Sequence, residues 1–279
     1  METKKVWLVT GASKGLGLSL VQKLLNQNFK VIATSRNVES LISVIGNESE
    51  NFLPIQLDFT SDPEVKLSII KSIEYFGKID FVVNNAGYGQ IGTLEELSDA
   101  EVKENFNINV FGSINIIRNI MPYMRNQKSG HIFNIASIGG YFGAFAGWGV
   151  YCATKFAVVG FTEALAEEVK DFGIKATVVY PGYFKTDFLN KNSIKTPNLP
   201  IADYEAARQS EQTHLENING NQTNDPEKAA DVLIAISKEE NPPVHLLLGN
   251  DAYEIVKIKN NVMENDVEKW KNYTLSTTL

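Results

Sequence analysis

Short apolar runs alternate with amphipathic helical segments along most of the chain. The run Val6 to Val9 predicts a buried strand, and later runs have the same β-branched and aromatic character. These further strand candidates are Lys30 to Thr34, Phe52 to Gln56, Ile79 to Val83, His131 to Ala136, Ile174 to Tyr180 and Val244 to Leu248. Helical stretches of about ten residues or more separate them. The alternation predicts an α/β fold, a single doubly wound parallel sheet with helices on both faces.

No internal repeat and no Pro/Gly-rich linker divides the sequence, so we expect one domain over residues 1–279. The stretch Asn190 to Pro200 is polar and contains proline, which favours a substrate lid over about residues 188–220. We expect higher mobility near residues 190–215 without ligand. Helical periodicity resumes after the proline-bearing stretch, through about Leu215.

The C-terminal extension, about residues 250–279, has the pattern of an amphipathic helix. Its apolar side chains recur at short helical intervals: Ile255, Ile258, Val262, Val267 and Trp270. Such a helix could cap the substrate pocket, pack on its own domain or pair subunits. Packing against the core is the default expectation.

A glycine-rich turn, Thr10 to Gly17, joins the first predicted strand to a helical pattern. Gly11, Gly15 and Gly17 follow a Gly-x-x-x-Gly-x-Gly spacing. Glycines let the backbone turn tightly and approach a phosphate, and the helix N-terminus attracts negative charge. A glycine-rich turn alone is often an ordinary loop, but its place between strand and helix favours a Rossmann-like dinucleotide site.

A tyrosine four residues before a lysine, Tyr151 and Lys155, is the strongest chemical signal in the sequence. On a helix the two side chains share one face. A free phenol has a pKa of about 10, and a neighbouring ammonium would lower it by roughly two to three units, towards the pH at which a proton donor works. In an isolated helix the same pair is usually an ordinary surface feature, so its meaning depends on the rest of the chain.

Further landmarks follow in one order: Asn84-Asn85-Ala86-Gly87, Asn109, Ser137, the Tyr151 and Lys155 pair, and Pro181-Gly182. With the glycine turn, they make the chain resemble the short-chain dehydrogenase/reductases, in particular carbonyl reductases and hydroxysteroid dehydrogenases. The resemblance covers about residues 5–190 and continues loosely to about 250. It implies an NAD(P)-dependent oxidoreductase that acts on CH–OH and C=O groups.

The resemblance also implies four catalytic residues. Tyr151 would donate a proton to the substrate oxygen, and Ser137 would bind and orient the carbonyl. Lys155 would hold the nicotinamide ribose and lower the pKa of Tyr151, while Asn109 would hold a water that relays protons to Lys155. Taken singly, Ser137 could be a strand-end cap and Asn109 a helix-packing amide.

The end of the second predicted strand indicates which dinucleotide binds. NAD-type folds place an acidic residue about 20 residues after the glycine turn, where this chain has Ser35 and Arg36. Ser35 can hydrogen-bond a 2′-phosphate and Arg36 can bind it with a charged fork, and Lys14 adds a second cation. We therefore expect NADP, with NADPH preferred over NADH; two solvated basic side chains are the alternative.

Other cofactor contacts come from the resemblance. Asp58 would bind the adenine amino group, Asn85 to Gly87 would support the cofactor and the sheet, and Thr186 would contact the nicotinamide carboxamide. The full expected cofactor-binding set is Gly11, Ser13, Lys14, Gly15, Leu16, Gly17, Ser35, Arg36, Asp58, Asn85, Ala86, Gly87, Tyr151, Lys155, Pro181, Gly182 and Thr186.

Aromatic residues on either side of the Tyr-Lys pair predict the substrate walls. The candidate pocket residues are Tyr141, Phe145, Trp148, Tyr183 and Phe188. Such walls suit a hydrophobic carbonyl compound better than a sugar or a short hydroxy acid. The alternative is that about half of these residues pack the core.

Composition narrows the possible partners and location. A net charge of -7 disfavours a nucleic-acid or anionic-membrane surface, and no apolar run is long enough to cross a bilayer. The single cysteine, Cys152, cannot form an internal disulfide, and no signal peptide precedes the first strand, so we expect a cytoplasmic protein. The three histidines have no ligand-like spacing, so we expect no metal.

These observations predict an NADPH-dependent oxidoreductase that reduces a hydrophobic ketone to a secondary alcohol, reversibly, by hydride transfer with Tyr151 as proton donor. A 3-oxoacyl carrier-protein reductase is an alternative enzyme, and a non-catalytic NADP-sensing protein is an alternative of another class. The resemblance further implies a homodimer or homotetramer.

Overall fold

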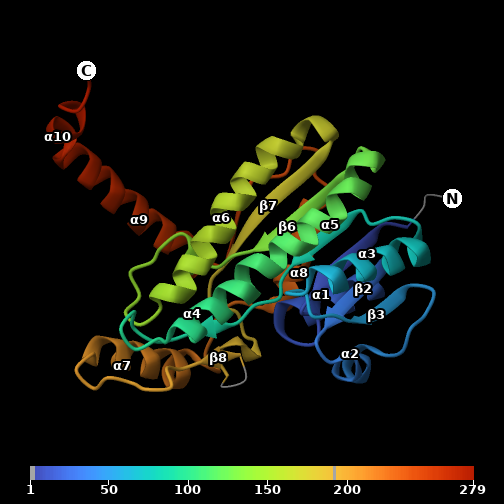
Figure 1. Ribbon diagram of the computed structural model, residues 1–279, viewed down its shortest axis with the longest axis horizontal. Coiled ribbons are helices and arrows are strands. Elements are labelled where there is room, and N and C mark those ends of the chain that lie inside the picture. The colour runs from blue at the N-terminus through green and yellow to red at the C-terminus, as the bar shows by residue number, and fades with distance from the viewer. Residues whose placement is uncertain (1–3, 191–192) are drawn as a thin grey trace.

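The computed structural model describes residues 4–190 and 193–279. Seven parallel strands form its central sheet, in the order β3-β2-β1-β4-β6-β7-β9 (Figure 1). Their bounds are β1 (Val6–Thr10), β2 (Lys30–Ser35), β3 (Phe52–Gln56), β4 (Phe81–Asn84), β6 (Gly130–Ile135), β7 (Ile174–Pro181) and β9 (His245–Leu248). The predicted α/β parallel sheet is confirmed, and every predicted strand is present.

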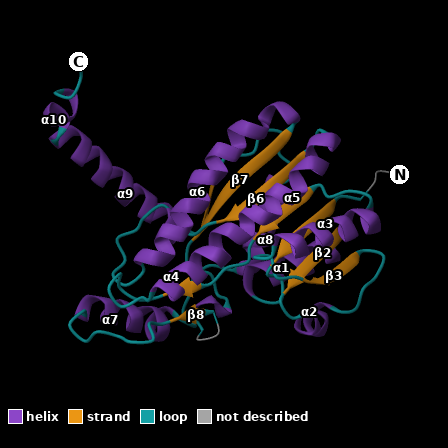
Figure 2. Ribbon diagram, in the orientation of Figure 1, coloured by secondary structure: helices purple, strands orange, loops and turns teal. Residues whose placement is uncertain are grey.

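Helices cover both faces of this sheet (Figure 2). On one face lie α1 (Gly15–Asn26), α2 (Val38–Ile45) and α8 (Pro226–Ile236), and on the other lie α3 (Asp62–Phe76), α5 (Gly112–Gln127) and α6 (Gly149–Val169). Strand β1 shows why two layers are needed. Val6 and Leu8 pack in the core cluster that includes α3, α5 and α6, whereas Trp7 and Val9 pack in the cluster that includes α1 and α8.

The chain reverses its direction across the sheet between β1 and β4, which pair with each other. Strands β2 and β3 extend the sheet on one side of this point and β6, β7 and β9 on the other. Ligands of such sheets bind beyond the carboxyl ends of the strands at the reversal. The loops after β1, β2, β4, β6 and β7 therefore frame the expected site.

A smaller structure lies over this edge. Strands β5 (Gly89–Gln90) and β8 (Ile194–Lys195) pair in parallel, and α4 (Asp99–Phe106) and α7 (Glu205–Gln212) lie near them (Figure 1). The helical continuation predicted to about Leu215 is confirmed by α7 and the π-helix η5 (Thr213–Ile218). Two residues of the predicted mobile stretch, Lys191 and Asn192, lie outside the described residues, and its mobility stays a prediction.

The predicted C-terminal helix exists as α9 (Asn250–Lys269), followed by α10 (Lys271–Leu275), but packing against the core is wrong. Both helices project from the body (Figure 1). Ala252 is buried, whereas Ile258 is 55% exposed and Trp270 is 50% exposed. Short-range pairs such as Lys257 with Glu254 are compatible with a solvated helix. Of the helices in the described residues, none is both long and apolar enough to cross a membrane.

Candidate functional site

The glycine turn fits tightly against the loop after β4. A Cβ on Gly11, whose φ is +64°, would lie 2.8 Å from Cα of Ala86, and a Cβ on Gly17 would lie 2.5 Å from Nδ2 of Asn85. The Asn85 amide donates hydrogen bonds to the carbonyl oxygens of Thr10, at 3.0 Å, and Gly11, at 3.1 Å. The two motifs, far apart in sequence, thus fix each other's backbone.

The N-terminus of α1, which follows this turn, is suited to an anion. Its N-cap residue, Lys14, makes no side-chain capping hydrogen bond, and the first turn contains no acidic residue. The first amides of a helix have no partner within the helix and favour negative charge. A diphosphate can therefore supply the missing acceptors.

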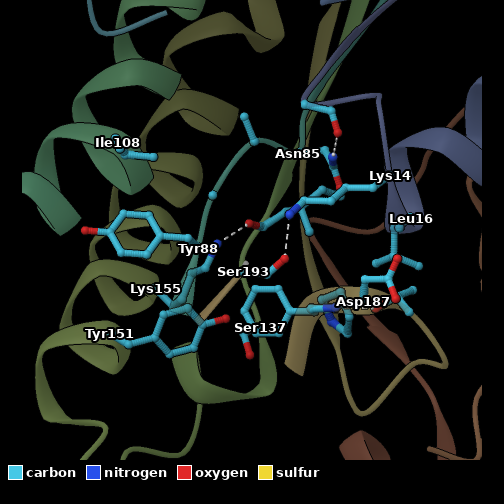
Figure 3. A pocket seen from close by; sticks show the side chains of 18 of the residues that line it. Lys14, Leu16, Asn85, Tyr88, Ile108, Ser137, Tyr151, Lys155, Asp187 and Ser193 are labelled. Carbon is cyan, nitrogen blue, oxygen red and sulfur yellow. Dashed lines mark hydrogen bonds between the residues drawn. The ribbon is translucent and has the colours of Figure 1, made fainter. Parts of the chain in front are cut away.

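The cationic residues expected to select NADP lie close to this turn. The side chains of Ser35 and Ser13 are 3.4 Å apart, and exposed Arg36 lines the same cavity. Lys14 Nζ donates to Ser193 Oγ at 2.6 Å (Figure 3). Burial lowers the pKa of Lys14; the negative charge of Asp187 opposes this shift, and the positive charge of Arg36 adds to it by a smaller amount. The two cations are thus near enough to act on one anionic group.

Asn109 lies in a π-helix, η1 (Asn107–Phe111), between α4 and α5. Its amide donates to the carbonyl oxygen of Tyr88 at 3.0 Å and to Thr154 Oγ1 at 3.1 Å, and its Oδ1 accepts from the Tyr88 amide at 3.0 Å. A Cβ on Gly87 would lie 3.0 Å from Asn109 Oδ1 and 3.6 Å from Lys155 Nζ. The side chain of Asn109 therefore holds the loop beside Lys155 in place.

The other three predicted catalytic residues come together. Tyr151 and Lys155 lie on α6 and are buried, and Ser137 follows β6 beside the Tyr151 phenol (Figure 3). Ser137 Oγ accepts from the amide of Gly139 at 3.1 Å. Lys155 Nζ lies 5.8 Å from the centre of the Tyr151 ring. The spacing of four residues thus places both side chains on the face of α6 that meets Ser137.

The expected lowering of the Tyr151 pKa is wrong for this structure. Burial raises the pKa of Tyr151 above its ordinary value, and a hydrogen bond with the Ser137 hydroxyl only partly opposes it. Burial also lowers the pKa of Lys155 to about 8. The sequence indicates that the two residues are neighbours, but burial, which penalises charge on both side chains, has the largest effect on each pKa. Tyr151 is therefore protonated at neutral pH.

One cavity of about 660 Å³ connects these groups. Ser137, Tyr151 and Lys155 line it, as does every expected cofactor-binding residue except Gly17. Gly17 and Asn109 support the walls from behind through their contacts with Asn85 and the Tyr88 loop. The residues that line the cavity are far apart in the sequence, from Gly11 to Gln222.

Four of the five predicted substrate-pocket residues, Phe145, Trp148, Tyr183 and Phe188, line this cavity. Tyr141 does not. Its ring packs on Tyr180, with centres 5.9 Å apart, and its hydroxyl donates to Asn260 Oδ1 in α9 at 2.6 Å. The 3-10 turn Ile138–Gly140 lies directly before Tyr141, whose side chain meets Tyr180 and α9 and not the cavity.

Several polar residues of the cavity were not predicted from the sequence, among them Asp187, Ser193, His214 and Gln222. Gln222 is 8% exposed, and neither atom of its amide group has a partner among the described residues. His214 is hydrogen-bonded to Tyr183. These residues belong to the segment after β7, where no motif marks them. Only the polarity of that segment indicated a role near the substrate.

The residues present fit a nicotinamide dinucleotide. The positive φ angles of Gly11 and Gly15 place backbone, without side chains, at the entrance of α1, and the cavity runs from there to Tyr151. A side chain at Gly87 would approach Asn109 and Lys155. The glycine positions thus allow the close backbone packing that shapes this end of the cavity.

Comparisons with known proteins agree with this geometry. The short chain dehydrogenase family model matches residues 5–196. Oxidoreductase BOA17 of Botryotinia fuckeliana is 35% identical over 274 residues, which cover 98% of this chain and 99% of that protein. The 3-ketodihydrosphingosine reductase of Bacteroides thetaiotaomicron is 35% identical over 250 residues, which cover 88% of each chain.

A solved short-chain dehydrogenase from Streptomyces avermitilis superposes with a TM-score of 0.91 at 32% identity, over 100% of both chains. Membership of one protein family therefore explains the parallel sheet, the glycine turn and the surroundings of Tyr151. The chain belongs to the short-chain dehydrogenase family and is an NAD(P)-dependent oxidoreductase.

Proposed function

We propose that this protein is an NADPH-dependent carbonyl reductase that converts a hydrophobic ketone to a secondary alcohol, reversibly. One observation carries the proposal. The buried Tyr151 phenol lies beside Ser137 where the glycine-lined groove meets an aromatic wall, within a single cavity. A proton donor is thus available at the place where a dinucleotide and an apolar substrate would meet.

Residues around the groove would hold the cofactor by its charged and polar parts. The N-terminus of α1 would bind the diphosphate, and Ser35, Arg36 and Lys14 would bind the 2′-phosphate. Asp58, which lines the cavity, would bind the adenine, and Thr186 the carboxamide. When bound, NADPH supplies a hydride to the carbonyl carbon of the substrate.

The chain's own residues supply the proton and orient the substrate. Ser137 would donate a hydrogen bond to the carbonyl oxygen, and Tyr151 would transfer its phenolic proton to that oxygen as negative charge develops there. Lys155 would hold the ribose. The ketone thus gains a hydride at carbon and a proton at oxygen, and the reverse transfers oxidise the alcohol.

Asn109 is proposed as a positioning residue for proton return to Lys155. Both hydrogens of its side-chain amide are donated to Tyr88 and Thr154, so a relay water would have to use an oxygen acceptor. The π-helix that contains Asn109 has a non-standard backbone pairing, which is frequent at functional sites. We propose that the backbone of this π-helix supports the water site, so that the side-chain hydrogens of Asn109 are not needed there.

Hydrophobic walls support the substrate class. Trp148 and Phe188 lie with ring centres 5.5 Å and 6.0 Å from that of Tyr151, and both line the cavity. Burial of such surface favours an apolar ligand. A relative named as a 3-ketodihydrosphingosine reductase, whose name denotes a keto substrate, also supports ketone reduction here.

The proposal is tested by the loss of NADPH absorbance, with NADH in parallel, against aryl, steroidal and aliphatic ketones. We expect ketone-dependent oxidation that favours NADPH and apolar ketones. Tight NADPH binding without turnover of any ketone would refute a reductase and favour a dinucleotide-sensing protein.

We also propose, from the family resemblance, a homodimer or homotetramer formed through α5 and α6. Exposed Phe111, at 53%, and Phe156, at 44%, lie at the start of α5 and on α6. Light scattering should give a dimer or tetramer that Phe156→Glu weakens. Val44→Glu, on exposed α2 at the other side of the sheet, is the matched control. The cytoplasmic location also stays a prediction.

A further inference from the structure

Tyr183 and His214 form a hydrogen-bonded pair in the cavity wall. The Tyr183 hydroxyl lies 2.9 Å from His214 Nε2, and both residues line the cavity. His214 Nδ1 lies 2.7 Å from the carbonyl oxygen of Ser210. Because a carbonyl can only accept, Nδ1 carries the hydrogen of a neutral imidazole, and Nε2 is left as an acceptor. The Tyr183 hydroxyl therefore directs its hydrogen at His214.

The surroundings of His214 favour this neutral form. The residue is 7% exposed, and its ring lies among aromatic side chains, with centres 4.7 Å from Trp148 and 6.4 Å from Phe145. Burial lowers the pKa of His214 below its ordinary value, which keeps the imidazole uncharged at neutral pH. Two residues thus fix the direction of the Tyr183 hydroxyl hydrogen. His214 on η5 accepts it, and the carbonyl of Ser210 on α7 fixes which nitrogen of His214 is free to do so.

Tyr183 is also held firmly from its backbone. Its amide donates to Asp251 Oδ2, at the start of α9, at 2.6 Å, and its carbonyl accepts from Asn224 Nδ2 at 2.9 Å. A Cβ on the preceding Gly182 would lie 2.2 Å from Asp251, so only glycine allows this close approach. The phenol is therefore preorganised before any substrate arrives.

The pair lies near the reacting group. Tyr183, Trp148 and Phe188 belong to the same apolar cluster as Tyr151. Tyr183 and Tyr151 also line the same cavity. A ketone whose carbonyl meets Tyr151 would present another part of its skeleton to Tyr183.

A substrate group that forms a hydrogen bond with the Tyr183 hydroxyl must be the donor of that bond. The Tyr183 hydroxyl already donates its hydrogen bond to His214, so towards a ligand its oxygen can only accept. We propose that Tyr183, oriented by His214, is a specificity residue that accepts a hydrogen bond from a hydroxyl or amine on the substrate. The preferred substrate is then an apolar ketone that carries a hydrogen-bond donor. This inference rests on the proposed reductase function and adds which ketones are preferred.

The test uses matched ketones of one apolar skeleton, with hydrogen, hydroxyl or methoxy at the same carbon, and moves that carbon along the skeleton. Wild-type enzyme with NADPH should prefer the hydroxyketone at one position by about tenfold in kcat/KM over both analogues, mainly through KM. An aminoketone of the same skeleton separates the two kinds of donor. Methoxy fills the space of the hydroxyl but cannot donate.

Two variants distinguish recognition from folding. Tyr183→Phe should lose the hydroxyl preference, and its circular dichroism spectrum and urea unfolding midpoint should show that it is folded. His214→Phe should free the Tyr183 hydrogen, so the methoxyketone should gain relative to the hydroxyketone. Tyr141→Phe is the matched control, because Tyr141 lies outside the cavity lining, and its preference should equal that of wild type.

The outcomes separate this inference from the function on which it rests. Turnover of the plain ketone with no hydroxyl or amine preference at any position would overturn the inference alone. A preference that persists in Tyr183→Phe would assign recognition to another residue and overturn it as well. No turnover of any ketone with either dinucleotide would overturn the proposed function, and the inference with it.

Discussion

The Lys155 ammonium donates a hydrogen bond to the carbonyl oxygen of Ile135, at 2.9 Å, and so joins α6 to the last residue of β6. Ser137 follows Ile135 by two residues, in the loop after β6. One contact therefore sets the distance between the helix that carries Tyr151 and the strand end that carries Ser137.

Because burial lowers the pKa of Lys155 to about 8, its charge should be lost within the alkaline range. Lys155 is protonated below this value and neutral above it, so kcat/KM for ketone reduction should fall as the pH rises through about 8. Lys155→Arg should shift this decline to higher pH, since arginine stays charged. A pH profile that is flat through this range would show that ketone reduction does not require the Lys155 charge.

Arg36→Ala should weaken NADPH selectively. A hydrogen bond to a charged group contributes about 1.5–3 kcal/mol, so KM for NADPH should rise at least tenfold while KM for NADH changes little. Steady-state kinetics with both dinucleotides measure this. Arg118→Ala is the matched control, because Arg118 is exposed, pairs with Asp62 and does not line the cavity. Equal weakening of both cofactors by Arg36→Ala would rule out 2′-phosphate recognition.

Glu96 joins the segment over the site to the body. Its buried carboxylate accepts from Arg208 at 2.9 Å and from the amides of Thr93, at 2.7 Å, and Ile201, at 2.8 Å. Glu96→Ala should lower the free energy of unfolding by about 2–3 kcal/mol, because it removes charged hydrogen bonds and leaves Arg208 with its pair to Glu211, at 2.8 Å, but without Glu96.

The same variant should speed hydrogen exchange in residues 201–218, which contain α7 and η5. Urea unfolding and exchange mass spectrometry measure the two effects. Asp99→Ala, which removes an exposed pair with Lys103 on α4, should change neither. Unchanged exchange in Glu96→Ala would show that the ion pair does not hold this segment.

Buried His131 should make the fold sensitive to acid. Its Nε2 lies 2.9 Å from the Thr177 hydroxyl, which itself donates to the carbonyl of Pro243, so His131 donates through Nε2. Burial lowers the pKa of His131 from 6.5 to about 3, with a smaller effect from Lys175. In that range the unfolded chain binds the extra proton, so stability falls as the pH falls, by about 1.4 kcal/mol per pH unit.

Urea unfolding at several pH values tests this. His131→Gln keeps a donor at the position and should reduce the dependence on pH between 6.5 and about 3. An identical dependence in wild type and His131→Gln would place the acid sensitivity elsewhere.

Much of the fold follows from local patterns in the sequence. The run Val6 to Val9 predicts β1 because alternate side chains must be buried on both faces, and the structure buries all four. The short sheet of Gly89–Gln90 and Ile194–Lys195 could not be predicted, since two residues give no periodicity and their partners are far apart in sequence.

The site divides in the same way. Tyr151, Lys155 and the glycine turn can be found because their spacing reflects one helix face and one strand-helix turn. Tyr141 and His214 cannot be placed from sequence, because a tight turn and a tertiary contact, not spacing, determine the sides that they face. The pKa of Tyr151 has the same origin, since burial depends on the whole surrounding structure.

If Tyr151 donates the proton to the substrate, removal of its hydroxyl should slow ketone reduction without loss of cofactor binding. We would measure kcat/KM for ketone reduction and Kd for NADPH in wild type, Tyr151→Phe and the control Tyr141→Phe. Tyr151→Phe should lose roughly 10²–10⁴-fold in kcat/KM and bind NADPH within a few-fold of wild type, while the control keeps both values. Undiminished reduction by Tyr151→Phe would show that Tyr151 is not the proton donor.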